Sequence, residues 1–160
     1  MQFDSTRLKH YQDLLQTTDL IESYQEFIRL FRFLRIELEK ELPQCKFQGN
    51  IVENAMDYSY FQFTTPDLKN KGLKLVIAFV HRTFSFEVCL SGYNRKYQCE
   101  THALLSKREQ PYFLGTDPAK QDYILRTIMP QPENMADGEA LVQVLKKESL
   151  QLIQMCEETL

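Results

Sequence analysis

The chain has 160 residues, of which 43% are hydrophobic and 26% are charged, and its net charge is −3. This length fits a single domain over residues 1–160, and the composition is that of a globular rather than a disordered protein. So small a negative charge produces no overall field that would attract nucleic acid or an anionic membrane. No segment approaches the roughly 18 consecutive apolar residues of a membrane-spanning helix.

The N-terminal segment MQFDSTRLKHYQDLL mixes polar and apolar residues and lacks the apolar core of a secretory signal peptide. The four cysteines show no CxxC motif and no paired spacing, so we expect reduced thiols. These residues are Cys45, Cys89, Cys99 and Cys156. We therefore predict a cytoplasmic protein with no membrane partner and no strong tendency to bind nucleic acid.

Two helices are predicted before the first strand. The first covers about Ser5 to Gln16. The second begins after Asp19, a plausible N-cap, and is stopped by Pro43, which gives it about six turns and a length of roughly 35 Å. Its apolar residues recur at spacings of three and four and form one stripe. They are Leu20, Tyr24, Phe27, Phe31, Leu34, Leu38 and Leu42.

The apolar period then changes to that of strands, which are predicted at residues 55–65, 73–81 and 84–92, with a turn at residues 66–72 between the first two. A helix capped by Asn94 follows at about 95–107, then a weaker strand at 123–129, a turn at 130–134, and a final helix marked by Leu141, Leu145, Leu152 and Cys156. The order is ααβββαβα. We predict an α+β fold with a mainly antiparallel sheet, a three-strand meander plus a later strand, packed against the long amphipathic helix.

The strand register follows from side-chain alternation, because a slip of one residue would turn a strand's apolar side chains to the wrong face. Burying the bulky residues together places Phe79 opposite Phe86, with a turn at Arg82 and Thr83. The turn contains no Gly or Asn, so a longer connection with the same alternation remains possible. The same rule predicts the further pairs Ile77–Val88, Phe61–Ile77 and Phe63–Leu75.

The opposite face of this sheet carries a central row of Tyr60, Ala78 and Glu87. Alanine leaves a trough between the two polar side chains, across which a tyrosine hydroxyl could reach the carboxylate. In the alternative interpretation Glu87 is an ordinary solvent-facing residue of an antiparallel strand, or it makes a structural hydrogen bond. The candidate binding residues are Tyr58, Tyr60, Gln62, Arg82 and Glu87.

The motifs of common catalytic and cofactor sites are absent. The sequence contains no HExxH, CxxC, GxGxxG, GxxxxGK[ST] or GxSxG, and its three histidines lie on different predicted elements. His81 falls on the apolar side of the hairpin, where we expect a hydrogen-bonded edge residue. We therefore assign no catalytic residue, no metal ligand and no cofactor.

The segments MDYSYFQF, LKLVIAFVH and FSFEVCLSGYNRKYQ, preceded by the helix SYQEFIRLFRFLRIELEKELP, resemble an uncharacterised bacterial family of small single-domain proteins. That family is a domain of unknown function. The resemblance implies a bacterial cytosolic protein and supplies no catalytic or binding residue.

The element order also resembles the core of the PD-(D/E)xK nuclease fold, which implies a metal held by Glu87 and by an earlier carboxylate, Asp57. Cys89 stands where that motif has lysine, and alternation places Asp57 on the face opposite Glu87. We therefore predict a non-enzymatic module that binds a small ligand or a protein partner through the tyrosine- and glutamate-bearing sheet face. The alternative is a metal-dependent hydrolase or degenerate nuclease-like domain centred on Glu87.

Overall fold

The computed structural model describes residues 1–129 and 134–160. In this part of the chain the helices are α1 (Ser5–Thr17), α2 (Leu20–Glu41), α3 (Pro66–Asn70), α4 (Arg95–Leu105) and α5 (Gly138–Thr159). The strands are β1 (Lys46–Asn54), β2 (Tyr58–Thr64), β3 (Leu73–Val80), β4 (Ser85–Gly92), β5 (Phe113–Leu114) and β6 (Leu125–Ile128). The turn predicted at 130–134 lies outside the described residues except for its last position.

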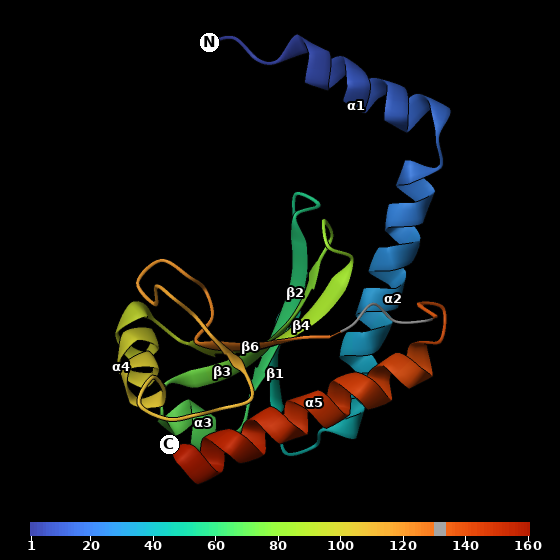
Figure 1. The fold of residues 1–160 in the computed structure, drawn as a ribbon. Coiled ribbons are helices and arrows are strands. Elements are labelled where there is room, and N and C mark those ends of the chain that lie inside the picture. The colour runs from blue at the N-terminus through green and yellow to red at the C-terminus, as the bar shows by residue number, and fades with distance from the viewer. Residues whose placement is uncertain (130–133) are drawn as a thin grey trace.

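The strands form one antiparallel sheet in the order β1-β2-β3-β4-β6-β5 (Figure 1). The α+β class, the meander β2-β3-β4 and the later strand β6 are confirmed. The predicted cap of α4 is confirmed as well, because the Asn94 side chain accepts a hydrogen bond from the backbone N–H of Tyr97 at 3.1 Å.

The predicted register is confirmed at every pair, including Phe79–Phe86. The connection between β3 and β4 is the longer of the two alternatives, since Val80 pairs with Ser85 and the backbone N–H of Phe84 donates to the carbonyl of His81 at 3.2 Å. Phe84, the first residue of the strand predicted at 84–92, lies instead in this turn with φ of 52° and is 42% exposed.

The core lies on the apolar face of the sheet, where it is covered by α2 and α5 (Figure 1). The stripe of α2 meets the strands through aromatic contacts, with ring centroids 5.1 Å apart for Phe31 and Phe61 and 4.6 Å apart for Phe27 and Phe79. The predicted packing of the long helix is therefore confirmed. The C-terminal helix joins α2 on the same side, which leaves the opposite face of the sheet free of both long helices.

Three elements lie outside the predicted order: β1, α3 and β5. Gly49, at φ of 63°, sits in β1 where the register with β2 shifts, and Gly-Asn at this point reads as a turn in the sequence. The turn from β1 to β2 uses Ala55 and Met56 with φ of 49° and 57°, although neither is a residue that normally adopts this conformation. The segment predicted as a turn at 66–72 contains the short helix α3, capped by the Thr65 side chain.

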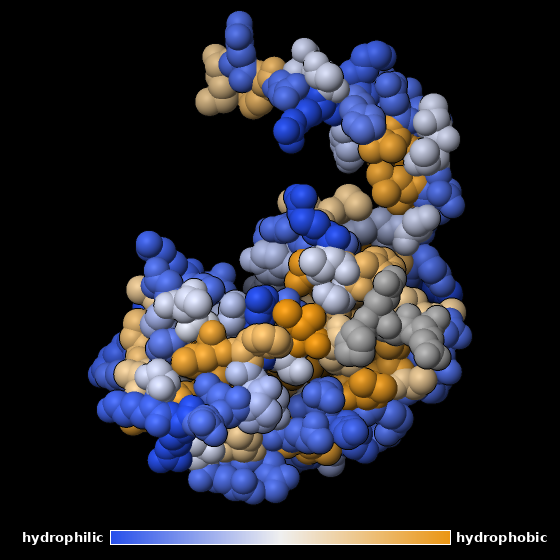
Figure 2. All heavy atoms as spheres, in the orientation of Figure 1, coloured by the Kyte–Doolittle hydropathy of each residue, from blue (hydrophilic) through white to orange (hydrophobic). Residues whose placement is uncertain are grey.

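The N-terminal helix α1 stands clear of the rest of the molecule, and none of its residues is buried (Figures 1 and 2). Apolar side chains of this helix are accordingly exposed, among them Leu8 at 57% and Tyr11 at 54%. None of the helices in residues 1–129 and 134–160 combines the length and the apolar character needed to cross a membrane.

His81 lies at the hairpin end of the core, as predicted. A ring nitrogen is 3.0 Å from the Ser59 hydroxyl, and the imidazole packs against the rings of Phe27 and Phe79 at centroid distances of 4.8 and 5.2 Å. Burial lowers the pKa of His81, and the charge of Asp57 opposes this shift only in part. The folded protein therefore favours the neutral imidazole.

Because the folded pKa of His81 lies below its unfolded value of about 6.5, the unfolded chain takes up the proton more readily. We expect the contribution of His81 to the free energy of unfolding to be fully present above about pH 6.5. This contribution should be lost as the pH is lowered through the folded pKa. Urea unfolding of wild type and of His81→Gln, measured at several pH values across this range, tests the prediction. The free energy of unfolding of the variant should depend less on pH than that of wild type. Replacing the exposed His10 in the same way is the control and should leave the slope intact.

Candidate functional site

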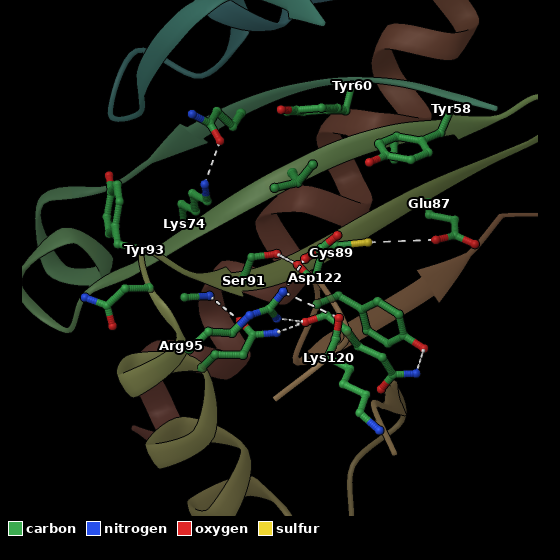
Figure 3. A pocket seen from close by; sticks show the side chains of 18 of the residues that line it. Tyr58, Tyr60, Lys74, Glu87, Cys89, Ser91, Tyr93, Arg95, Lys120 and Asp122 are labelled. Atoms are coloured by element: carbon green, nitrogen blue, oxygen red, sulfur yellow. Dashed lines mark hydrogen bonds and ion pairs between the residues drawn. The ribbon is translucent and has the colours of Figure 1, made fainter. Parts of the chain in front are cut away.

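A pocket of about 750 Å³ occupies the face of the sheet opposite the core (Figure 3). Its floor is made by alternate residues of β2, β3 and β4, and its walls come from the start of α4 and from the segment before β6. The floor residues are Tyr58, Tyr60, Gln62, Lys74, Val76, Ala78, Val80, Glu87, Cys89 and Ser91. The wall residues include Tyr93, Asn94, Arg95, Gln98, Lys120, Gln121, Asp122 and Tyr123.

The predicted central row is present, with Ala78 between Tyr60 and Glu87 in the registered strands. The rings of Tyr58 and Tyr60 lie side by side with centroids 6.0 Å apart. Neither hydroxyl has a hydrogen-bond partner among the described residues. The methyl side chain of Ala78 leaves the space in front of these rings open, so the pair presents both flat apolar surface and free polar atoms to the pocket.

Glu87 is neither a partner of the tyrosines nor an ordinary solvent-facing residue. It is only 8% exposed, and its carboxylate Oε1 accepts a hydrogen bond from Nη1 of Arg126 at 3.0 Å. Arg126 reaches it because β6 pairs with β4 and sets Arg126 opposite Cys89, on the same face. The guanidinium also lies over the ring of Tyr123, 4.8 Å from its centroid. Glu87 therefore makes a structural hydrogen bond, which is one of the alternatives that the sequence left open, and its carboxylate is bound by Arg126 rather than by a tyrosine.

The chemistry beside Glu87 does not resemble a nuclease site. Burial raises the pKa of the Cys89 thiol well above its usual range, so the thiol stays protonated. Asp57, which alternation placed on the opposite face, lines the same pocket, because it belongs to the turn before β2 rather than to the strand. In the described parts of the chain, no group of three or more His, Cys, Asp or Glu side chains is placed to hold a metal ion.

The other end of the floor is organised around Lys74. Its ammonium Nζ donates to the side-chain oxygen of Gln62 at 2.8 Å and lies 5.7 Å from the centroid of the Tyr93 ring. Gln62 donates in turn to Gln48 at 3.4 Å, and Gln48 donates to the Tyr93 hydroxyl at 2.6 Å. These contacts fix the positions of the polar atoms around the lysine.

The wall opposite β2 is held in place by Arg95 at the start of α4. Its guanidinium donates to the Asp122 carboxylate at 2.8 Å, and Ser91 on the floor donates to the Asp122 carbonyl at 2.7 Å. Arg95 also donates to the backbone carbonyls of Pro118, Lys120 and Gln121. The loop that leads into β6 is thus fixed to the helix and to the sheet at several points.

Four of the five predicted binding residues, Tyr58, Tyr60, Gln62 and Glu87, come together in this pocket. Arg82 does not, because it lies exposed in the turn between β3 and β4. Lys74 was missed although its alternation with Val76 and Ala78 places it on the same face. The wall residues offered no comparable signal, since they approach the floor only through contacts distant in sequence.

The fold and the site define a small α+β protein whose antiparallel sheet carries two long helices on one face and a pocket on the other. The chain belongs to the family described as Domain of unknown function (DUF7000), whose model matches residues 4–160. The predicted family membership is thereby confirmed, while a bacterial origin stays a prediction. No curated protein and no solved structure matches the chain.

Proposed function

We propose that this protein is a non-enzymatic module that binds a small molecule in the pocket on the tyrosine-bearing face. The observation that carries the proposal is the open trough at Ala78, with the paired rings of Tyr58 and Tyr60 beside it. The pocket volume of about 750 Å³ falls within the range of about 300–1,000 Å³ found for small-molecule sites.

The shape of this face favours a small molecule over a protein partner. Protein–protein interfaces of standard size bury about 800 Å² on each side and are broad surfaces rather than enclosed hollows. Here the start of α4 and the loop before β6 form walls around a floor of strands. A compact ligand can contact floor and walls together, whereas a protein would have to insert a narrow segment.

The hydrolase alternative has less support, because the Glu87 carboxylate that would bind the metal already forms an ion pair with Arg126. Arg126 binds the Glu87 carboxylate at 3.0 Å, and a metal cation on the same carboxylate would be repelled by this guanidinium. The neighbouring Cys89 supplies a protonated thiol where the nuclease motif has an ammonium. We therefore place Glu87 in the framework of the pocket, where it holds β6 against β4.

Nuclear magnetic resonance spectra of ¹⁵N-labelled protein test the proposal. A panel of small aromatic and aliphatic compounds, charged and uncharged, should include members that shift the backbone amides of Tyr60 and Ala78 and leave those of α1 unmoved. Shifts confined to other surfaces, or no shift with any compound, would contradict it. Addition of Mn²⁺ separates the alternative, because selective broadening around Glu87 that is lost in Glu87→Gln would support a metal site instead.

A further inference from the structure

The charged groups of the pocket differ in how they are compensated. Four of the charged side chains that line it, Glu87, Arg95, Asp122 and Lys120, take part in three close ion pairs, which are Glu87–Arg126 at 3.0 Å, Arg95–Asp122 at 2.8 Å and Lys120–Asp117 at 3.5 Å. Lys74 differs from them, because no carboxylate in the described part of the chain forms an ion pair with it. Among the described residues, the acceptor for its ammonium is the neutral amide oxygen of Gln62.

An ammonium group carries three N–H donors, and the contact with Gln62 accounts for one of them. Lys74 is only partly exposed, and burial lowers its pKa, while the charge of Asp122 opposes the shift. The folded protein thus holds a partly desolvated cation in the lining of the pocket, with N–H donors that no further described residue accepts. An anion at this point would offset the cost of desolvation and complete the hydrogen bonds.

The pocket has two unlike ends. Figure 3 shows Lys74 and Tyr93 at one end and Tyr58 and Glu87 at the other. Lys74 and Ala78 are four residues apart on β3, which corresponds to about 13 Å along a strand. A molecule longer than a single ring can therefore contact the lysine and the tyrosines at the same time.

We propose that the ligand carries a carboxylate or phosphate group that binds Lys74, with a flat apolar body that lies over Ala78 against Tyr58 and Tyr60. This inference rests on the proposed function and specifies the chemical class of its ligand. Asp57 precedes Tyr58 and also lines the pocket, and it forms no ion pair among the described residues. Its negative charge disfavours the reverse orientation, so the pocket selects the direction of the molecule as well as its charge.

Matched pairs of probes test the charge preference. Indole-3-acetate is compared with indole-3-acetamide, and 2-naphthyl phosphate with 2-naphthol, by titration calorimetry. We expect at least one anion to bind about tenfold or more tightly than its neutral partner, because charge-assisted hydrogen bonds are the stronger kind. Lys74→Met should abolish this preference. Lys96→Met is the matched control, since it makes the same change of net charge at an exposed residue outside the pocket.

The outcomes distinguish this inference from the proposed function. Equal binding of both members of each pair, or a preference that survives in Lys74→Met, overturns the anion site and leaves the small-molecule pocket in place. Failure of all four probes to bind contradicts both.

The wild-type protein gives an independent readout through ¹³C signals of its lysine side chains: the pKa of Lys74 should rise with indole-3-acetate and not with indole-3-acetamide. An unchanged pKa with the acid overturns the inference without any variant.

Discussion

Replacement of Ala78 by tryptophan is expected to abolish small-molecule binding while the protein stays folded. Ala78 is the central residue of the pocket floor, between Tyr60 and Glu87 in the register of the sheet. An indole group at this position fills the trough that a ligand would occupy. Tryptophan is well accepted in strands, and the side chain points into open space rather than into the core.

We expect the affinity for a pocket ligand such as indole-3-acetate to fall by about a hundredfold or more, since its body and the new side chain would compete for the same volume. Calorimetry measures the loss, and thermal unfolding checks that the fold is kept. The control is Val144→Trp, which introduces the same side chain at an exposed position of α5, on the other side of the sheet. Undiminished binding by Ala78→Trp would remove the basis for placing the ligand over the trough.

The second large effect concerns stability and compares two phenylalanines that are two residues apart. Phe86 is fully buried, with its ring 5.0 Å from that of Phe79 and 6.4 Å from that of Phe31. Truncation to alanine should lower the free energy of unfolding by about 3–5 kcal/mol, the range found for buried phenylalanine. Phe84 makes an edge contact with the ring of Phe79 at 5.1 Å and is 42% exposed, so its truncation should cost about 1 kcal/mol or less.

Urea unfolding of the two variants measures this difference directly. Because both changes remove the same atoms from neighbouring positions, effects on the unfolded chain are closely matched. A similar loss for Phe84→Ala and Phe86→Ala would mean that the turn residue is packed as tightly as the strand residue, contrary to the structure. The comparison therefore tests where strand β4 begins.

The floor of the pocket could be predicted from the sequence because one physical requirement decides it. Burial of Phe79, Phe86 and their neighbours on one face fixes the register, and the register then forces Tyr60, Ala78 and Glu87 together on the other. Strand alternation also places Lys74 on this face, so its position could have been predicted from the sequence. The role of Lys74 as a candidate anion site depends on its having no ion-pair partner in the described chain, and this is known only from the structure.

Strand β1, the turn after it and the partner of Glu87 could not be predicted, because the local sequence is misleading or the contact joins residues far apart in the chain. In β1, Gly49 and Asn50 look like a turn but form an irregularity within a strand, and the turn at Ala55 and Met56 lacks the usual glycine or asparagine. The partner of Glu87 depends on the pairing of β6 with β4, across 39 positions of sequence. Alternation within each strand is informative, but it does not say which distant strand lies beside it.

Arg95 fastens the loop before β6, and this has a consequence for how the protein can diversify. The residues that carry the fold lie beneath the sheet, whereas Lys120, Gln121 and Asp122 of the loop lie above it, joined to α4 by hydrogen bonds from the Arg95 and Gln98 side chains. Substitutions in the loop that keep these acceptors leave the interior layers untouched. Changes in this loop can therefore alter which ligands the pocket binds without changing the rest of the fold. Ligand specificity and stability can then evolve separately.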